Sequence, residues 1–250
     1  MLHAILLLAS LKLNLVHAAP LKVVVDPGHG GRDQGAIREG TAESDITLKV
    51  SRLLHRLLSS DHRFQSSLTR NEDQFLTLAD RARIAHDKKA DLFVSIHVNS
   101  NPDSRARGAE FYFQNHLPPD EESMRLAHAE NGGEAASPSG KYEFLEDNDY
   151  SPDVASIVSD LLDSNRVFKS SQLSKTLKEN WTGSRKTRSS SVMQAPFYVL
   201  SQIKAPSALV ELGFITNVRE RQELADAAIQ KQMAEDLYKG LVKFKESLDK

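Results

Sequence analysis

Apolar residues recur along this chain in two spacings, one typical of buried strands and the other of helices. Residues 23–25 and 91–97 form short, almost continuous apolar runs, and each leads into a polar turn or loop at a histidine, His29 or His97. Runs of this length and composition predict strands that are buried on both faces. The same reasoning predicts further strands at residues 63–69, 108–113, 197–200 and 208–212.

Between these runs, apolar residues return every three or four positions, which predicts helices. Residues 43–59 are the clearest case, with Glu43 at the first turn. Thr77, three residues before an acid, is typical of a helix start, and Asn217 is a candidate cap for the first of two C-terminal helices. Strands alternating with helices predict an α/β fold: a single domain at residues 22–248, with a twisted, mostly parallel sheet flanked by helices.

Residues 114–165 interrupt this pattern with prolines, glycines and a high density of acids. A short helix is predicted at residues 120–130, with a break after Asn131. The segment has too few buried-type residues for a core of its own, so we interpret it as an acidic insertion rather than a second domain. Residues 186–191, which are basic and rich in serine, are predicted to form a loop.

Residues 1–18 are typical of a signal peptide, with an apolar core and small residues before a cleavage site that we place after Ala18. The apolar stretch is shorter than the roughly 20 residues of a membrane span, and no later segment is long and apolar enough to be one. The sequence therefore predicts a periplasmic or secreted protein without a membrane span.

The composition of the 250 residues excludes several kinds of partner and metal ligand. The formal charge of −2 argues against a nucleic-acid partner, because nucleic-acid binding needs a basic surplus. The absence of cysteine excludes disulfides and thiolate ligands, so a metal must be held by His, Asp or Glu. With 40% hydrophobic residues the chain can build one ordinary core, and we expect a monomer.

Three reactive side chains fall at or just past the ends of predicted strands, namely His29, His97 and Glu211. The carboxyl ends of parallel strands form one edge of a sheet, where sites gather, so we expect these residues to lie close together. Two histidines and a carboxylate hold zinc with one position open, and another carboxylate nearby can act as a general base. The carboxylate ligand is Glu39 or Glu43 by this reasoning, and Glu211 is the base.

Other candidate ligands are better explained in simpler ways. Asp26 is predicted to cap the turn before His29 rather than to bind a metal. The remaining histidines of the mature chain lie in polar or helical contexts where surface exposure is expected: His55, His62, His86, His116 and His128.

Four motifs in order resemble the zinc-dependent N-acetylmuramoyl-L-alanine amidases of the amidase-3 family. They are residues 25–31 with Asp33 and Gly35, Glu43 opening a helix, residues 95–99, and residues 209–217. The resemblance implies Zn²⁺ held by His29, Glu43 and His97, with Glu211 as catalytic base. The implied reaction is cleavage of peptidoglycan between N-acetylmuramic acid and L-alanine.

The resemblance also bears on residues around the predicted site. It selects Glu43 over Glu39 as the ligand and makes Asn99 a candidate for the edge of the substrate site. Arg70 and Arg81 also match, and we interpret both as structural. Val98 stands where the family usually has alanine, which is a conservative change.

The insertion resembles part of the cell-division amidases, in which a helix plugs the zinc site until an activator protein withdraws it. Residues 124–131 carry this weaker resemblance, and Glu130 is the acid expected to approach the metal. The alternative is a mobile acidic surface loop, which the sequence supports equally well.

Other functions remain open at this point. A related zinc peptidase or deacetylase can use the same ligands on a different amide, and an inactive cell-wall-binding or regulatory module can keep the fold without the chemistry. Retention of all three ligands and Glu211 argues against the inactive module. A nucleotide loop is disfavoured, because the glycine turn lacks both the GxGxxG spacing and a following Lys-Ser/Thr pair.

Overall fold

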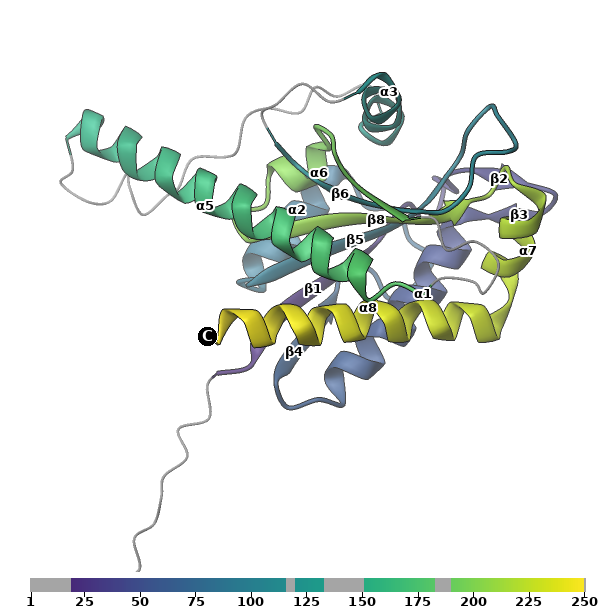
Figure 1. Cartoon of the computed structure of the whole chain (residues 1–250), viewed down its shortest axis with the longest axis horizontal. Helices are drawn as coiled ribbons and strands as arrows, with labels where there is room; N and C mark the ends of the chain where they lie inside the picture. The colour runs from purple at the N-terminus through teal and green to yellow at the C-terminus, as the bar shows by residue number, and fades with distance from the viewer. Residues whose placement is uncertain (1–18, 116–119, 133–150, 183–189, 250) are drawn as a thin grey trace, which may run out of the picture.

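The computed structural model describes residues 19–115, 120–132, 151–182 and 190–249 (Figure 1). The predicted signal peptide, His116 and all acids between Gly132 and Ser151 lie outside these residues.

The described chain is built on one six-stranded sheet, as the alternating pattern predicts. Neighbouring strands are parallel except β6 and β8, which run antiparallel. A small separate hairpin joins β2 (Ile37–Arg38) and β3 (Thr41–Ala42). Across the main sheet the order is β4 (Phe64–Leu68), β1 (Leu21–Pro27), β5 (Leu92–Asn99), β8 (Ser207–Phe214), β6 (Ala109–Phe113) and β7 (Ser190–Gln194).

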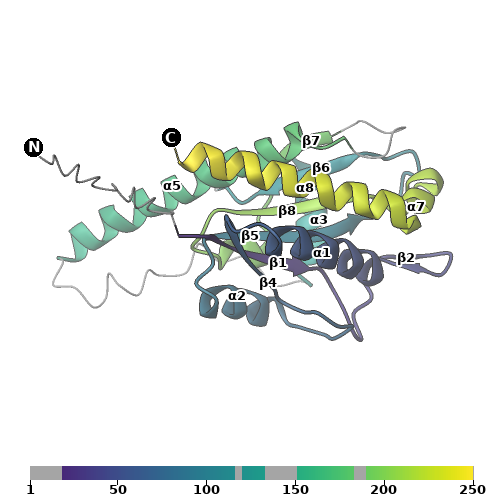
Figure 2. The same cartoon turned by 90° about the horizontal axis from the view of Figure 1, so that it is seen from below.

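Helices cover both faces of this sheet, which confirms the predicted sheet flanked by helices. One face packs against α1 (Glu43–Ser59), α5 (Pro152–Glu179) and α8 (Ala227–Leu248). Of these, α1 and α8 lie in front of the sheet in Figure 2. The other face packs against α2 (Leu78–Asp87), α3 (Glu121–Glu130) and α6 (Tyr198–Ser201). The short α7 (Val218–Ala225) links β8 to α8.

Successive strand residues alternate between two hydrophobic cores. On β5, Leu92, Val94 and Ile96 enter the larger core with α1 and α8, whereas Phe93 enters the smaller core with α2 and α6. The alternation fixes which polar residues share a face, because side chains two positions apart point the same way. His97 therefore belongs to the face that α2, α3 and α6 cover.

Several local predictions are confirmed at their residue. Helix α1 occupies residues 43–59, as its periodicity predicts. Thr77 caps α2 through a reciprocal pair of hydrogen bonds with Asp80. Asn217 caps α7, since its side chain accepts from two backbone N–H groups of the first turn.

Two predictions for the C-terminal half are wrong. Residues 197–200, predicted as a strand, lead into and form part of the short helix α6. Residues 190–191, predicted as part of a loop, begin strand β7, which pairs in parallel with β6. A four-residue apolar run has no readable period. Strand β7 is a short edge strand that begins with two serines and pairs through the backbone with β6.

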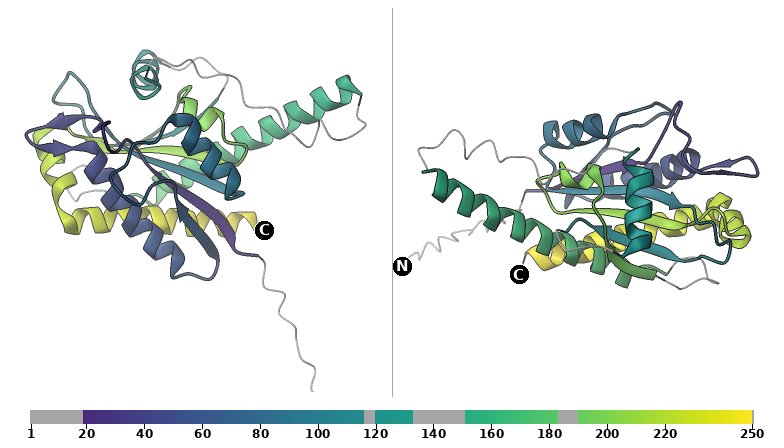
Figure 3. Two further views of the ribbon diagram at one scale, coloured as in Figure 1. Left: turned by 180° about the vertical axis from the view of Figure 1, so that it is seen from behind. Right: turned by 90° about the horizontal axis from the view of Figure 1, so that it is seen from above.

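Helix α5 is a single element of 28 residues that crosses the proposed end of the insertion at residue 165. Its C-terminal part packs Leu173 and Leu177 into the larger core. Its N-terminal part projects beyond the sheet (Figures 1 and 3), where Ile157 and Leu161 are exposed. The insertion boundaries accordingly remain a prediction.

None of the described helices is both long and apolar enough to cross a membrane.

Candidate active site

The site begins at the turn after β1, where two imidazoles approach closely. The ring centroids of His29 and His97 are 5.0 Å apart. Gly28 makes this possible, because a Cβ at that position would lie 2.5 Å from Cε1 of His97. His29 itself has a φ of 57°, a left-handed conformation that few residues other than glycine adopt.

Two buried arginines hold this turn by its carbonyl oxygens. Nε of Arg70 donates to the carbonyl of Pro27, and its Nη2 donates to that of Gly28. Arg81 donates to the carbonyls of Pro27 and His29. Three successive carbonyls are thus fixed by guanidinium groups that are themselves almost completely buried. The structural interpretation of both arginines agrees with these contacts.

Asp26 completes this support, and its predicted role as a turn cap is wrong. It lies inside β1, fully buried, and its carboxylate accepts from the side chains of Thr69, Arg81 and Ser95. Burial alone would raise its pKa, but Arg81 and the hydroxyl donors outweigh that effect and lower it. Asp26 is therefore an ionised partner for a buried guanidinium.

Glu43 lies at the first turn of α1 with both carboxylate oxygens held by the backbone. Oε2 accepts from the N–H of Ala36 and Oε1 from the N–H of Val98. The helix N-terminus also favours a negative charge there. The rival ligand Glu39 points elsewhere: its side chain is 78% exposed and pairs with Arg221 at 2.6 Å.

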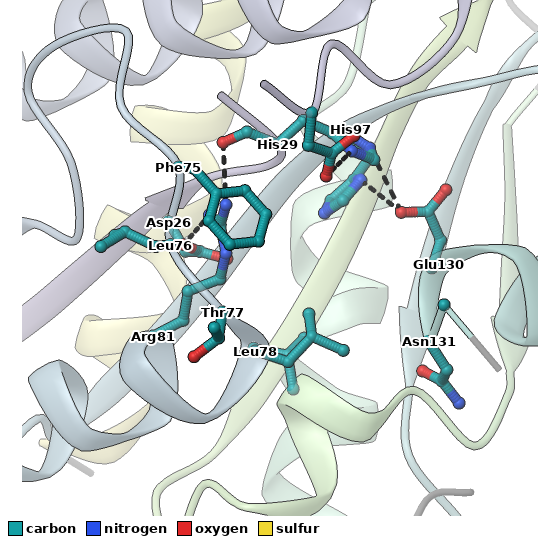
Figure 4. Close-up of a pocket in the computed structure, with 13 residues that line it drawn as sticks. Asp26, His29, Phe75, Leu76, Thr77, Leu78, Arg81, His97, Glu130 and Asn131 are labelled. Carbon is teal, nitrogen blue, oxygen red and sulfur yellow. Dashed lines mark hydrogen bonds and ion pairs between the residues drawn. The ribbon is translucent and has the colours of Figure 1, made fainter. Parts of the chain in front are cut away.

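The structure brings the predicted ligands together. Nε2 of His29 and Nδ1 of His97 each lie 3.2 Å from Oε1 of Glu43. Glu130 joins them, with its Oε2 at 3.3 Å from His29 and 3.0 Å from His97, as Figure 4 shows. One ligand atom from each of these four residues lies within 4.8 Å of all the others.

These four ligand atoms fit a metal cation better than they fit hydrogen bonds to one another. The two imidazole nitrogens are buried, and neither has good hydrogen-bond geometry to a partner within the described residues. The other nitrogen of His29 lies 2.9 Å from Asp33, which fixes the ring as a carboxylate behind a metal ligand does. Although burial opposes it, the Glu130 and Glu43 carboxylates raise the pKa of His97 to about 10. A cation in place of these protons would relieve the same concentration of negative charge.

Glu211 lies next to this cluster but pairs with nothing in the described chain. It is fully buried on β8, its Cα registers with that of His97, and neither carboxylate oxygen has a hydrogen-bond partner there. Burial raises its pKa well above the usual range, and the nearby acids Glu130 and Glu43 add to this shift while His97 opposes it. A buried, perturbed carboxyl beside a metal-binding cluster is a candidate general base.

Glu130 reaches the site because α3 lies across it. Leu126 and Ala127 of α3 pack into the smaller core. Asn131, directly after the helix, accepts from the N–H of Tyr198 and donates to the carbonyl of Pro196. The C-terminal end of α3 is thereby attached to the start of α6.

A cavity of about 230 Å³ opens beside these residues. Phe75, Leu78 and Val199 are among its apolar lining residues. In Figure 4, His97 and Glu130 lie across from Phe75 and Leu78. The cavity gives the cluster an opening on the face of the sheet that α3 partly covers.

Sequence reasoning missed two residues near the site. Glu110 on β6 lies directly opposite Glu211 and bonds to Asn99, and Asn131 secures α3. The position of Glu110 in an alternating strand was visible, but its neighbour across the sheet was not. Asn131 was seen only as the point where a helix breaks.

The comparisons with known proteins agree on one family. The family model described as N-acetylmuramoyl-L-alanine amidase, Amidase_3, matches residues 23–243. N-acetylmuramoyl-L-alanine amidase AmiA of Escherichia coli (strain K12) is 34% identical over 224 residues, which are 89% of this chain and 75% of the relative.

Further relatives extend the match. "Probable N-acetylmuramoyl-L-alanine amidase AmiB" of Haemophilus influenzae is 32% identical over 92% of this chain, which spans 53% of that relative's length. Among solved structures, N-acetylmuramoyl-L-alanine amidase AmiC2 of Nostoc punctiforme superimposes with a TM-score of 0.65 at 27% identity, covering 90% of this chain and 97% of that one.

Proposed function

Since the chain belongs to the N-acetylmuramoyl-L-alanine amidase family, we propose that it hydrolyses peptidoglycan at the amide between N-acetylmuramic acid and L-alanine, with zinc as cofactor. The observation that carries the proposal is the convergence of His29, Glu43 and His97 beside the unpaired carboxylate of Glu211. Metal ligands and a separate buried carboxyl are the parts that hydrolysis of an unactivated amide requires.

The donor set fits zinc, because two imidazole nitrogens and a carboxylate oxygen are ligands that this ion commonly takes in hydrolases. Zinc held there acidifies water and polarises a carbonyl oxygen. His29, Glu43 and His97 hold the ion in this proposal. Asp33 orients His29, and the N–H groups of Ala36 and Val98 orient Glu43.

Glu211 transfers the proton in the proposed reaction. It takes a proton from the attacking water and passes it to the nitrogen of the leaving L-alanine residue as the C–N bond breaks. The water oxygen remains on the lactyl carbonyl carbon, so the products are a carboxylate and an amine. The position of Glu211 on a central strand keeps its carboxylate rigid relative to His97.

Glu130 regulates access in the proposed function. Its carboxylate lies within 3.3 Å of both imidazole nitrogens, where a substrate carbonyl or water would need to bind. Withdrawal of α3 by an activator protein would open the site, and export by residues 1–18 would bring the chain to its substrate. The alternative of a free surface loop is disfavoured by the contacts of Glu130 and Asn131.

Replacing Glu211 by Gln tests the chemistry. Glu211→Gln removes the proton acceptor without changing the side-chain volume, so the variant should retain zinc while hydrolysis falls about 100- to 10,000-fold. Metal analysis of the purified protein and mass spectrometry of products from cell wall and soluble muropeptides measure both effects. Full activity in the variant would exclude Glu211 as the base.

The same assay separates the alternatives. Release of L-alanyl peptides from intact N-acetylmuramic acid supports the amidase, whereas loss of acetyl groups or cleavage within the peptide identifies a deacetylase or peptidase. If wild type and Glu211→Gln are equally inactive on both substrates, the chain is a non-catalytic module.

Replacing Glu130 by Ala tests the regulation. Basal hydrolysis should rise, because the variant lacks the carboxylate that occupies the position of substrate or water beside His29 and His97. Glu121→Ala, an exposed acid on the same helix, serves as the control and should leave activity unchanged. Equal activity of Glu130→Ala and wild type would contradict the blocking role.

A further inference from the structure

A hydrogen-bonded bridge of side chains crosses the sheet next to Glu211. Nδ2 of Asn99 on β5 donates to Oε2 of Glu110 on β6 at 2.8 Å, and the hydroxyl of Tyr112 donates to the same oxygen at 2.9 Å. Strand β8 lies between β5 and β6 in the sheet. Since neighbouring strands are about 4.8 Å apart, the two side chains reach across roughly twice that distance over β8.

The strand register places this bridge beside the proposed base. Glu110 is paired with Glu211 across the antiparallel β6–β8 ladder, and Glu211 is paired with His97 across the parallel β5–β8 ladder. Residues paired in this way project from the same face of a sheet. The β5–β8 register shifts between His97 and Asn99, so that Asn99 pairs with Phe214. Its bond to Glu110 nevertheless brings the Asn99 side chain over β8 on the face that carries the metal-binding cluster.

The side-chain oxygen of Asn99, Oδ1, takes no part in the bridge. Asn99 is only 3% exposed, yet its Oδ1 has no hydrogen-bond partner in the described parts of the chain, and the same is true of both oxygens of Glu211. Buried polar atoms are nearly always paired, so a group of three unpaired acceptors next to a reaction centre indicates a place for donors from a ligand.

Glu110 determines which end of the Asn99 amide is free. An oxygen that already accepts from Tyr112 takes the N–H side of the amide, so the carbonyl side turns away from Glu110. The geometry therefore presents a fixed acceptor beside Glu211. An acceptor binds an N–H or O–H group of the ligand and rejects a bare oxygen.

We propose that Oδ1 of Asn99 accepts a hydrogen bond from the N–H of the scissile amide, and that Glu110 is the positioning residue that orients Asn99 for this contact. The inference rests on the proposed amidase function and names the group by which that site recognises its substrate. Asn99, placed at the edge of the site by resemblance alone, acquires a defined partner.

The scissile N–H is the donor because of where the leaving nitrogen must lie. Glu211 delivers to this nitrogen the proton that it took from water, so the nitrogen lies against Glu211 and beside Asn99. The nitrogen keeps its own hydrogen throughout, gains the second from Glu211 and leaves as an amine when the C–N bond breaks. As the nitrogen becomes more positive, its hydrogen bond to Asn99 strengthens, which favours the transition state over the bound substrate.

Helix α3 covers this region without forming the bridge. Arg125 of α3 donates to the carbonyl of Ser100, and Glu122 bonds to Asn101, so the helix lies over the loop that follows β5. Asn99 and Glu110 themselves belong to strands. The Tyr112 hydroxyl also bonds to the buried Ser123 of α3. The bond between Asn99 and Glu110 is therefore the part of the bridge that should persist when α3 moves away and act in the open enzyme.

A pair of substrates tests the contact with the zinc-loaded full chain. One is an N-acetylmuramoyl-L-alanyl peptide, and the other is the ester analogue in which oxygen replaces the scissile N–H. Asn99→Ala should lower kcat/KM about 10- to 100-fold on the amide and less than about twofold on the ester, which has no hydrogen to donate. A defect in folding or metal binding would lower both values equally.

Variants of Glu110 test the positioning role. Glu110→Gln keeps an oxygen that accepts from Asn99 and Tyr112, so it should retain the wild-type preference, whereas Glu110→Ala should resemble Asn99→Ala. Asn71→Ala, at an exposed asparagine in the loop after β4, is the control and should leave kcat/KM on both substrates unchanged. The same set in a Glu130→Ala background removes any limit that α3 sets on turnover.

The outcomes distinguish this inference from the proposed function. If wild type cleaves neither substrate, the proposed function fails. If wild type cleaves the amide but Asn99→Ala loses activity on both substrates equally, or on neither, the contact with the scissile N–H is wrong. Separate behaviour of Asn99→Ala and Glu110→Ala would remove the positioning role of Glu110.

Discussion

At the scale of single residues, the geometry of the site depends on charge buried behind it. Arg70 and Arg81 bind three consecutive carbonyls of the histidine turn, and Asp26 is the one carboxylate that pairs with Arg81 among the described residues. A buried ion pair adds little net stability, but removing one partner is costly because the other charge stays buried. The turn that carries His29 is therefore sensitive to residues that never approach the substrate.

Asp26→Asn should destabilise the protein by about 3–5 kcal/mol at neutral pH, because it leaves the Arg81 guanidinium without its counter-ion. The folded-state pKa of Asp26 is lowered, so its contribution is present above the ordinary aspartate pKa of about 4 and is lost as pH falls through the lower folded value. Denaturant unfolding of wild type and variant across pH 2–7 measures the difference. It should shrink below about pH 4, and a constant difference would contradict this explanation.

Gly28→Ala should weaken metal binding about 10- to 100-fold, a loss typical of changes that disturb a ligand's orientation. The new Cβ would meet three atoms of the His97 ring at 2.5–2.8 Å, so the imidazole must move. Competition with a chromophoric chelator measures the affinity. Gly40→Ala is the control for a glycine substitution away from the ligands: its Cβ would meet nothing within 4 Å, and the strain from its φ of 77° falls on the β2–β3 hairpin turn. Equal affinity of the two variants would mean that the ring adjusts freely.

The sequence predicts candidate site residues that have reactive side chains and lie at the ends of predicted strands, such as His29, His97 and Glu211. It could not predict Glu110, because that residue matters only through the antiparallel pairing of β6 with β8. Asp26 was misjudged for a related reason, since its partners Thr69 and Arg81 come from other elements. Contacts between distant segments have no periodic signal in the sequence.

At the scale of elements, long periodic segments were predictable and short ones were not. The 17 residues of α1 repeat the helical spacing often enough to fix both ends, whereas the run that became α6 is too short to show any period. Helix α5 has no continuous apolar stripe, because its apolar residues face the core only near Leu173 and Leu177, while Ile157 and Leu161 are exposed. A hydrophobic stripe predicts burial only where a partner surface exists.

Helix α3 is an element whose attachment should control activity. Asn131→Ala removes two hydrogen bonds that join the end of α3 to the start of α6. If this weakens the closed arrangement by about 1.4 kcal/mol, the open fraction and basal hydrolysis rise about tenfold. Turnover of a soluble muropeptide measures the effect. His128→Ala, exposed on the same helix, should have wild-type activity, and no rise for Asn131→Ala would contradict the attachment.

At the scale of the whole molecule, the parallel strands gather their reactive residues at one edge of the sheet. Glu43 arrives from α1, His97 and Glu211 from central strands, and Glu130 from α3, so segments far apart in sequence converge on one small volume. The carboxylates of Glu43 and Glu130 meet two imidazoles there and raise the pKa of His97, so without a metal the folded site holds protons in their place. A cation that replaces these protons binds only where the fold has brought the ligands together, and it should therefore stabilise the folded state.

Zinc should therefore raise Tm, and chelation should lower it. At a free zinc concentration about 100 times Kd, binding adds about 2.7 kcal/mol to the free energy of unfolding, which corresponds to about 5–10 °C for a domain of this size. Calorimetry in zinc and in chelator measures the shift. Glu211→Gln should keep it, because Glu211 is not a proposed ligand, whereas His97→Ala should lose most of it. Equal Tm in zinc and chelator would mean that the four-residue cluster does not bind this metal, and the chemistry assigned to Glu211 would then need another source of activated water.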